Sequence, residues 1–506
     1  MSAQTQTEGV VAQAGGLKRA LSALGNGALT FAGVGVFGGL YSLYGFSLNA
    51  VGGSEFWGWI VIGISVGAMV LVFAELASKY PFAGSMYQWP TIISGKRVGW
   101  WIGWMYAWAI FPLMTAYYAS MPILIYGIFD IPAEQQNFTL YAGIITICAI
   151  VSVLWNLIRI GILGRIAQWA MILEIVVVFV VCLVTLVLGV KHFGNLTQTA
   201  TVVTDAAGAA SVVPLESLGQ WIPLFLAAGI FNAIWVQYTF ENGGTLGEET
   251  KDAERNAPKG VVGAFIFVII CGLLFYLTLT PSIPDMSNAM INYSPAGDAI
   301  LSVLPAWVFK LFLSAVAIGL LVATATMFTG GVRHIYGMAR DGQLPFSRFF
   351  AKTLGDGSPW AATLLIGVFS LIPLFVFQTT TAAIVGGATA AMYLTYFLVL
   401  LVVFIHRLRG WPKVKPVFRL GSWGILVNLV AVIGVGLTLL NLLWPRPGTN
   451  PTWNQATGGE AGFLGNIPLA WLLIGLPLIV GVIFYAFWHK RVHSHPMAID
   501  AYNPQP

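Results

Sequence analysis

Long runs of apolar residues, separated by short polar segments, make up most of this chain. A helix needs about 20 apolar residues to cross the hydrocarbon core of a bilayer, and twelve runs reach that length. The apolar residues are continuous within each run, whereas a membrane β-barrel would alternate them with polar ones. The runs predict membrane-spanning helices at 29–49, 56–78, 98–129, 138–158, 166–190, 220–240, 259–280, 305–330, 361–378, 382–405, 422–444 and 467–488.

The composition agrees with an integral membrane protein. Of the 506 residues, 58% are hydrophobic and 8% are charged, whereas soluble domains carry about 25% charged residues. The three cysteines lie inside apolar runs and form no spaced pair, so we expect neither a disulfide framework nor a zinc site. The sequence therefore predicts no metal and no cofactor.

The positive charges are distributed unevenly between the predicted loops. All but three of the 24 lysines and arginines fall in loops on the side of the N-terminus, the exceptions being Lys191, Lys310 and Arg446. Cytoplasmic loops are enriched in lysine and arginine. We therefore expect a multi-pass protein of the cytoplasmic membrane with both termini in the cytoplasm. The lipid bilayer accounts for the net charge of +5, and we expect no nucleic-acid partner.

Two of the predicted helices are interrupted. The first contains Gly33, Gly35, Gly38 and Gly39, and the sixth runs into the polar and glycine-rich segment 240–247. Each glycine inside a helix costs about 1 kcal/mol. If the first ten spans form two repeats of five, these helices correspond, and such a pair marks the midplane binding site of secondary transporters. Close packing through small residues is the alternative interpretation of these glycines.

Four segments resemble the amino acid–polyamine–organocation permeases, and most closely their amino acid/choline branch. The sixth helix and its loop read YTFENGGTLGEETKD at 238–252, followed by Pro258, similar to the family's pattern of an aromatic, an acid, small residues, a Glu-Glu pair and a proline. The other three segments are ELASKYPFAGSMY at 75–87, RHIYGMARDGQLP at 333–345 and FRLGSWG at 418–424.

This resemblance implies an all-α membrane protein with a leucine-transporter-like fold. Its twelve helices would form two inverted repeats of five and two additional C-terminal helices. The implied segments are a cytoplasmic tail at 1–28, a first repeat at 29–190, a second repeat at 220–406, the last two helices at 422–488 and a cytoplasmic tail at 489–506. The chain departs from the family at Thr239, where glycine is frequent, and at Gly38-Gly39, where a Ser/Thr-Gly pair is frequent.

The predicted substrate site lies where the two helices are interrupted. Freed N–H groups of a broken helix bind a carboxylate, and freed carbonyls bind an ammonium group. For Glu241 the resemblance implies a gate or a partner of the substrate amine, and the alternative is a cap of the following half-helix. The predicted substrate-binding residues are Gly35, Val36, Gly38, Gly39, Trp235, Tyr238, Thr239, Phe240 and Glu241.

Ionisable residues inside a membrane point to function unless they are paired. Glu174 has no basic residue within one helical turn, and we expect it to carry the coupling proton. For Glu75 an ion pair with Lys79, one turn further along, is the simpler explanation. Thr324, Thr326 and Thr329 would suit sodium, but threonines also bond to the carbonyls of their own helix. The Glu248–Glu249 pair is expected to lie in a solvated cytoplasmic loop, and a gate network is the alternative.

These observations predict a proton-coupled permease that moves a small amino acid or amine by alternating access. An exchanger that uses no ion, or a carrier of polyamines or choline-like cations, is the alternative. No paired catalytic groups are visible, so the protein is not expected to be an enzyme. A membrane receptor would usually carry an additional soluble domain, and the polar ends of this chain are short.

Reporter fusions test the predicted topology. A fluorescent protein fused to the C-terminus should fluoresce, because the positive loops keep that end in the cytoplasm, and alkaline phosphatase at the same place should be inactive. Fusions after Gly194, in a predicted outside loop, serve as the control and should give the opposite pattern. Phosphatase activity at the C-terminus would contradict both the orientation and the even number of spans.

Overall fold

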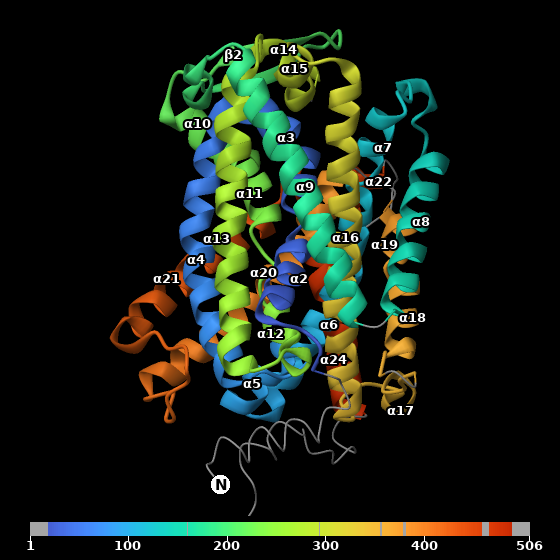
Figure 1. The fold of residues 1–506 in the computed structure, drawn as a ribbon, viewed down its shortest axis with the longest axis vertical. Coiled ribbons are helices and arrows are strands. Elements are labelled where there is room, and N and C mark those ends of the chain that lie inside the picture. The colour runs from blue at the N-terminus through green and yellow to red at the C-terminus, as the bar shows by residue number, and fades with distance from the viewer. Residues whose placement is uncertain are drawn as a thin grey trace, which may run out of the picture.

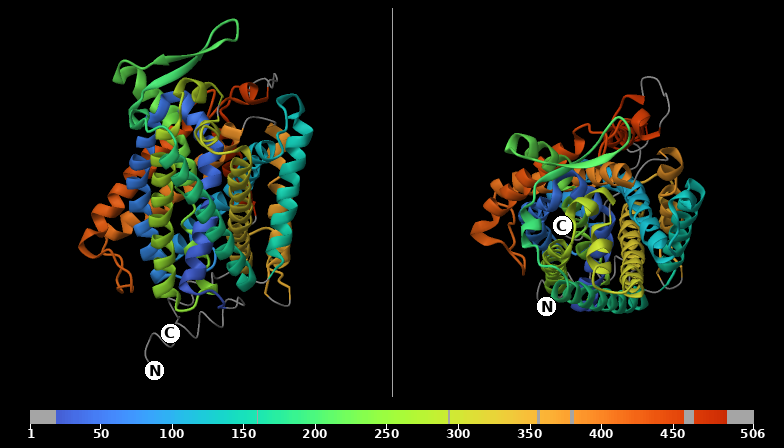
Figure 2. Two further views of the ribbon diagram at one scale, coloured as in Figure 1. Left: turned by 45° about the horizontal axis from the view of Figure 1, so that its top comes forward. Right: turned by 90° about the horizontal axis from the view of Figure 1, so that it is seen from above.

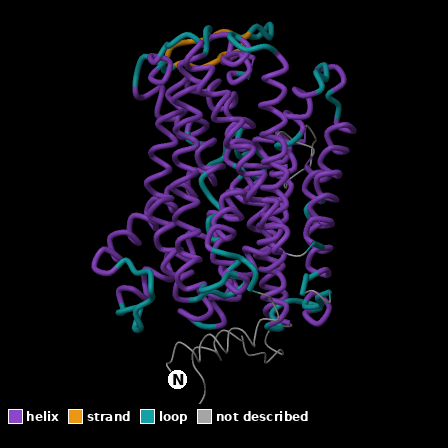
Figure 3. The backbone as a smooth tube through the Cα atoms, in the orientation of Figure 1, coloured by secondary structure: helices purple, strands orange, loops and turns teal. Residues whose placement is uncertain are grey.

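A computed structural model describes residues 19–158, 160–292, 294–354, 357–377, 381–457 and 465–487. These residues form a bundle of long, roughly parallel helices with one small β-hairpin at one end (Figures 1 and 3). Ten helical stretches in the described part of the chain are long and apolar enough to cross a membrane. The first of them, Ala23–Lys79, contains the first two predicted spans, and the shorter apolar stretch Trp360–Val376 contains the ninth.

Helices follow one another through the first half of the chain. The element α9 is the longest helix of this half, and the 3-10 turn η1 joins the first span to the second. The elements are α2 (Ala23–Val34), α3 (Val36–Val51), η1 (Gly52–Glu55), α4 (Phe56–Lys79), α5 (Ser85–Ser94), α6 (Lys96–Ala119), α7 (Pro122–Ile128), η2 (Ala133–Gln135), α8 (Phe138–Asn156), α9 (Ile160–Leu188) and η3 (Phe193–Thr197).

The second half begins with the hairpin and the interrupted sixth span. The ninth predicted span, 361–378, is two short helices, and α16 continues ten residues beyond the predicted end at 330. The elements are β1 (Ala200–Thr204), β2 (Ala210–Pro214), α10 (Leu218–Leu224), the π turn η4 (Phe225–Gly229), α11 (Phe231–Val236), α12 (Asn242–Thr245), η5 (Gly247–Glu249), α13 (Ala253–Leu279), η6 (Thr280–Ser282), α14 (Met286–Asn292), α15 (Pro295–Leu301), α16 (Ala306–Arg340), α17 (Ser347–Phe350), α18 (Trp360–Phe369), α19 (Ile372–Phe377), α20 (Thr381–Leu408), η7 (Gly421–Trp423), α21 (Gly424–Leu443), α22 (Trp453–Thr457) and α24 (Leu469–Phe487).

The two interrupted helices lie at the centre of the bundle. The helix α2 packs against α9, α13 and α16, and α3 packs against α11 and α16. Glycines of α13 allow neighbouring helices to lie close to it. A Cβ on Gly260 would lie 2.2 Å from Asn26 Oδ1 of α2, and one on Gly272 would lie 2.0 Å from Trp59 of α4. The helices α8, α18 and α19 stand together on one side of this centre (Figures 1 and 2). Glycine at such contacts allows backbones to approach closely without a hydrophobic driving force.

The hairpin covers one end of the bundle, which we call the hairpin face. Its strands pair antiparallel in a register that places Ala200 opposite Pro214 and Thr204 opposite Ala210. The side chain of Asp205 accepts hydrogen bonds from the backbone N–H groups of Ala207 and Ala209, which closes the turn. These bonds to the loop's own backbone are typical of aspartate in turns.

A buried ion pair joins α4 to α20. The carboxylate of Glu75 pairs with the guanidinium of Arg407, and its other oxygen accepts the backbone N–H of Leu420 at 3.1 Å. Only 1% of Glu75 and 7% of Arg407 is exposed. Glu75 therefore forms an ion pair, as expected, but its partner is Arg407 and not Lys79. Lys79 instead donates to the carbonyl of Val414.

Replacing Arg407 by methionine should destabilise the protein. Removing one partner of a buried ion pair leaves an uncompensated charge, at a cost of about 3–5 kcal/mol. We expect a clearly lower thermal unfolding temperature of the purified protein in detergent. The control is Arg409→Met, because Arg409 is exposed. Equal unfolding temperatures for the two variants would show that the pair contributes nothing.

Candidate functional site

The first helix is interrupted at a single residue, Gly35. Its backbone has φ 62° and ψ 48°, a left-handed conformation that ends α2 and begins α3. A side chain would be strained there, and a Cβ would also come within 2.8 Å of Ala323 Cβ. The hydroxyl of Tyr117 donates to the Gly33 carbonyl at 2.6 Å, so that one freed carbonyl has a side-chain partner.

The interruption of the sixth helix is longer. The helix α11 ends at Val236 and α12 begins at Asn242, so that five residues between them are outside regular helix. Thr239 has φ 67°, a conformation that costs a residue with a β-carbon about 1–2 kcal/mol. Its N–H donates to the hydroxyl of Tyr396 at 3.2 Å, and this bond helps to hold the strained backbone.

Glu241 lies within this interruption and is fully buried. The hydroxyl of Tyr106 donates to its Oε1 at 2.7 Å, whereas Oε2 has no hydrogen-bond partner among the described residues. The side chain does not cap α12; the N–H groups of that turn donate to the backbone carbonyls of Thr239, Phe240 and Glu241. The capping interpretation is thus not realised, and one carboxylate oxygen is available to another group.

Three aromatic rings adjoin the two interruptions. The ring centroids of Tyr117, Trp235 and Tyr238 lie 5.3–6.5 Å apart in pairs, and all three residues are buried. The structure therefore brings together Trp235, Tyr238, Thr239 and Glu241 of the predicted site. Trp104 of α6 lies outside this cluster and stacks against Phe484 of α24.

The other predicted site residues lie at helix contacts. A Cβ on Gly38 would be 2.8 Å from Leu320 Cβ, and one on Gly39 would be 2.8 Å from Val236 Cγ2. The ring of Phe240 packs against Phe265 of α13 at 5.5 Å. Gly38 and Gly39 therefore set how closely α3 approaches α16 and α11, and Val36, at the start of α3, is also buried.

Glu174 projects from α9 into the contact with α16. A Cβ on Gly319 would lie 2.1 Å from the Glu174 carboxyl carbon, so the absence of a side chain there makes room for the acid. Glu174 is 4% exposed, its Oε1 has no hydrogen-bond partner among the described residues, and it forms no ion pair with any of them. The next residue of α16, Leu320, is the one that contacts Gly38.

Sequence reasoning missed Asn242, the first residue of α12. Its side chain lies between Gly33 of α2 and Gly330 of α16, and neither its oxygen nor its nitrogen has a hydrogen-bond partner in the described part of the chain. The hydroxyl of Thr326 nearby is likewise without one, whereas Thr324 and Thr329 bond to carbonyls of their own helix. An amide next to Glu241 in a broken helix was the signal that could have identified it.

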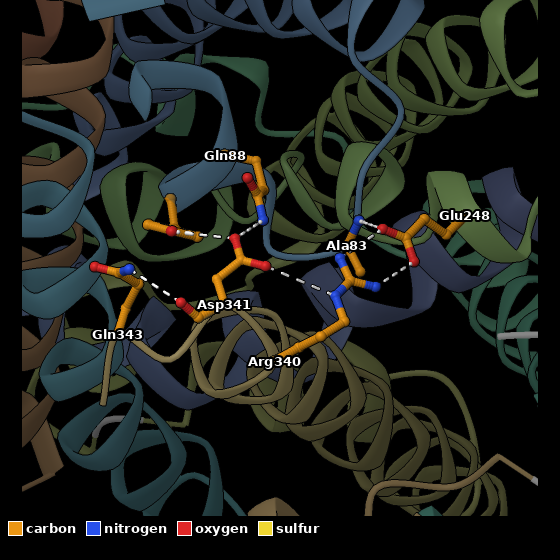
Figure 4. Close-up of polar contacts among 7 residues, drawn as sticks. Ala83, Gln88, Glu248, Arg340, Asp341 and Gln343 are labelled. Carbon is orange, nitrogen blue, oxygen red and sulfur yellow. Dashed lines mark hydrogen bonds and ion pairs between the residues drawn. The ribbon is translucent and has the colours of Figure 1, made fainter. Parts of the chain in front are cut away.

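A network of buried charges lies near α5, at the end of the bundle opposite the hairpin face (Figure 1), and Figure 4 shows its polar contacts. Glu248 accepts two bonds from Arg340 at 3.1 and 3.2 Å and one from the N–H of Ala83 at 3.0 Å. Asp341 accepts from Tyr87 and Gln88. The solvated loop expected for Glu248 and Glu249 is therefore wrong, because 5% or less of either residue is exposed.

Glu249 extends this network to the start of the described chain. Its carboxylate pairs with Arg333 of α16 at 3.2 Å, and its carbonyl accepts the N–H groups of Ala20 and Leu21. Residues from three of the family-like segments, 75–87, 238–252 and 333–345, thus meet at this end. The fourth, 418–424, joins them through the bond from Leu420 to Glu75.

Comparisons with known proteins find relatives that match most of this chain. The Amino-acid permease BAT1 homolog of Oryza sativa subsp. japonica is 26% identical over 493 residues, which cover 90% of this chain and 91% of that protein. The Branched-chain amino acid permease BcaP of Lactococcus lactis subsp. cremoris (strain MG1363) is 22% identical over 389 residues, which cover 73% and 78%.

A similar structure supports the fold. The crystal structure of MhsT in complex with L-phenylalanine superposes with a TM-score of 0.56 at 16% identity, covering 82% of this chain and 98% of that one. The family model described as amino acid permease matches residues 24–458. This match spans most of the chain, and the protein, a multi-pass membrane transporter and not an enzyme, therefore belongs to the amino acid permease family.

Proposed function

We propose that this protein is a secondary active transporter that carries a small amino acid or related amine across the cytoplasmic membrane by alternating access, coupled to protons. The observation that carries the proposal is the pair of interruptions at Gly35 and at 237–241, which adjoin one another around a buried carboxylate. Interrupted helices at membrane depth are tolerated where they line a binding cavity.

The two interruptions offer complementary groups to an amino acid. The first N–H groups of α3, at Val36, Phe37 and Gly38, have no intrahelical acceptor and would bind the substrate carboxylate. The unpartnered Oε2 of Glu241 would accept the substrate ammonium. In this scheme Gly35, Gly39, Trp235, Tyr238, Thr239 and Phe240 shape the walls of the site.

We further propose that the chain crosses the membrane twelve times. The Ala23–Lys79 stretch would supply two spans, and α18 with α19 would supply the ninth. In this architecture the first and sixth helices occupy corresponding places in two inverted repeats. The hairpin face would then be outside and both termini cytoplasmic, in agreement with the positive charge of the loops at the opposite end.

The aromatic cluster is also compatible with a second class of substrate. Tyr117, Trp235 and Tyr238 next to Glu241 would also suit a polyamine or a choline-like cation, because aromatic faces attract positive charge. Thermal-shift screening of the purified protein separates these classes, since a bound substrate raises the unfolding temperature. Stabilisation by organic cations but not by amino acids would favour the second class.

Glu241→Gln should weaken transport of the substrate identified in that screen. A hydrogen bond to a charged group contributes about 1.5–3 kcal/mol, so we expect the half-saturation concentration for uptake into proteoliposomes to rise about tenfold or more. Tyr106→Phe should produce a smaller change in the same direction. Glu216→Gln, on the exposed outer loop, is the control. An unchanged half-saturation concentration in Glu241→Gln would refute the amine contact.

Glu174 is the proposed carrier of the coupling proton. An ionised carboxylate without a cation is costly inside a membrane protein, and Glu174 lies between α9 and α16 with no ion-pair partner among the described residues. Movement of α16 relative to α9 during transport would hydrate and dehydrate the carboxyl and so drive proton uptake and release. Exchange without an ion is the alternative, and sodium at Thr326 and Asn242 is the third.

Glu174→Gln should uncouple transport from the proton gradient. In proteoliposomes with an imposed pH gradient, we expect the variant to lose accumulation of substrate, because glutamine cannot carry a proton, while exchange of internal for external substrate continues. Glu216→Gln should accumulate substrate as the unmodified protein does. If Glu174→Gln still concentrates substrate in response to the gradient, the proton is carried elsewhere.

A further inference from the structure

A third buried acid without an ion-pair partner among the described residues, Glu55, lies at the hairpin face. It is the last residue of η1, the turn between α3 and α4, and is 1% exposed. Neither carboxylate oxygen has a hydrogen-bond partner among the described residues, and none of the ion pairs formed by those residues includes it. Glu55 also does not cap α4 with its side chain.

The backbone around Glu55 is held in place from outside. Gly52, with φ 65°, and Gly53 fit directly beneath the outer loop, where added Cβ atoms would lie 2.7 Å from the Gln198 carbonyl and 1.8 Å from the Asn195 carbonyl. Ser54 binds the same loop, since its N–H donates to the Gln198 carbonyl at 3.1 Å. Because the turn is fixed, the inward direction of the Glu55 side chain is built into the fold.

The surroundings of this carboxyl are polar but carry no positive charge. Ser47 and Tyr44 of α3 and Tyr276 of α13 are its neighbours, and Cys182 of α9 adjoins Tyr44. The turns η3 and η4, which also pack against η1, contain no titratable side chain. No lysine, arginine or histidine of the described chain is therefore placed to neutralise Glu55.

The same cluster contains an unused hydrogen-bond acceptor. Asn232 of α11 is fully buried and donates to the Tyr276 hydroxyl and to the Leu40 carbonyl, both at 3.2 Å, but its Oδ1 has no partner among the described residues. A cluster with a spare acceptor and no cation accommodates a carboxyl group that carries its own proton. The dipole of α4 favours the ionised form, but such a contribution is small beside the cost of burying a bare charge.

The cluster spans the outer parts of both interrupted helices. Tyr44 and Ser47 lie on α3, after the break at Gly35, and Asn232 lies on α11, before the break at 237–241. Ser47 also donates to the Ala228 carbonyl of η4 at 2.8 Å. A charge appearing on Glu55 would therefore oppose the close packing of these two half-helices.

An outer groove lies directly beside this turn. It has a volume of about 340 Å³ and is lined by Ser54, Trp57, Glu216 and Trp221, among others. Trp221 donates to the Ser54 hydroxyl at 2.8 Å. Glu55 is the next residue after Ser54, which lines this groove, and a proton would reach Glu55 from that side.

We propose that Glu55 is a proton-binding site on the hairpin face, separate from Glu174. Its carboxyl holds a proton while α3 and α11 are packed together as in this structure, and releases that proton toward the hairpin face when the two half-helices separate and water enters. The role in transport rests on the proposed function, whereas the protonation itself does not. Glu55 would then make opening at the hairpin face sensitive to the pH on that side.

Infrared difference spectroscopy of the full-length protein tests the protonation directly. In difference spectra between acid and alkaline pH, the unmodified protein should show the carbonyl stretch of the protonated Glu55 carboxyl, and this band should still be present at neutral pH. Glu55→Gln should lack the band, because glutamine has nearly the same shape and no proton to lose. Glu134→Gln, an exposed acid of the α7–α8 loop, and Glu174→Gln should retain this band. A spectrum of Glu55→Gln identical to that of the unmodified protein would overturn the proposal.

A second variant covers the case in which Glu55→Gln does not fold. Tyr276→Phe removes a hydroxyl beside the carboxyl, so the Glu55 band should shift and remain, and an unshifted band would place the signal elsewhere. In proteoliposomes, exchange of internal for external substrate does not depend on proton coupling through Glu174. This exchange should lose its dependence on pH at the hairpin face in Glu55→Gln, while substrate binding is retained. An unchanged pH profile would reduce Glu55 to a structural acid. Failure of the Glu174 assignment would leave the Glu55 band unaffected, so the two proposals fail separately.

Discussion

The structure is organised around the need to satisfy backbone polar groups where two helices are broken inside a membrane. Hydrocarbon offers no hydrogen bonds, so each freed N–H or carbonyl requires a protein partner or a ligand. Tyr117 supplies one such partner to Gly33 and Tyr396 supplies one to Thr239. These bonds bring tyrosines of α6 and α20 to the breaks, and so they place the aromatic cluster and Glu241 in one small volume.

Buried acids are paired with arginines at one end of the bundle and are unpaired toward the other. At the end opposite the hairpin, Glu75, Glu248 and Glu249 each pair with an arginine. Toward the centre and the hairpin face, Glu241, Glu174 and Glu55 have carboxylate oxygens without partners in the described chain. Paired charges stabilise one arrangement of helices, whereas unpaired acids respond to protons, ammonium groups and water. The paired acids are therefore suited to holding one end of the bundle closed, and the unpaired acids are suited to binding substrate and to coupling transport to protons.

The family-like segments illustrate how a pattern in the sequence acquires a physical meaning. Their order along the chain was sufficient to indicate the permease family, and the family match confirms it. Their shared role was not visible, because Ala83, Glu248 and Arg340 are far apart in the chain and meet only through folding. A pair of glutamates beside lysines and arginines resembles a solvated loop until the packing of α5 and α16 around it is known.

The sequence by itself predicted a bundle of long apolar helices, the interruption of the first and sixth helices, and the acids that lie in apolar segments. These follow from local rules, namely the length of an apolar run, the conformational freedom of glycine and the cost of a charge in a membrane. Only the tertiary structure decided that Gly38 and Gly39 are helix contacts and that Arg407 neutralises Glu75. It also decided that the side chains of Asn242 and Glu55 have no hydrogen-bond partner among the described residues. Whether a buried polar group is satisfied depends on atoms contributed by helices distant in the chain, and hydrophobic periodicity along one helix carries no information about them.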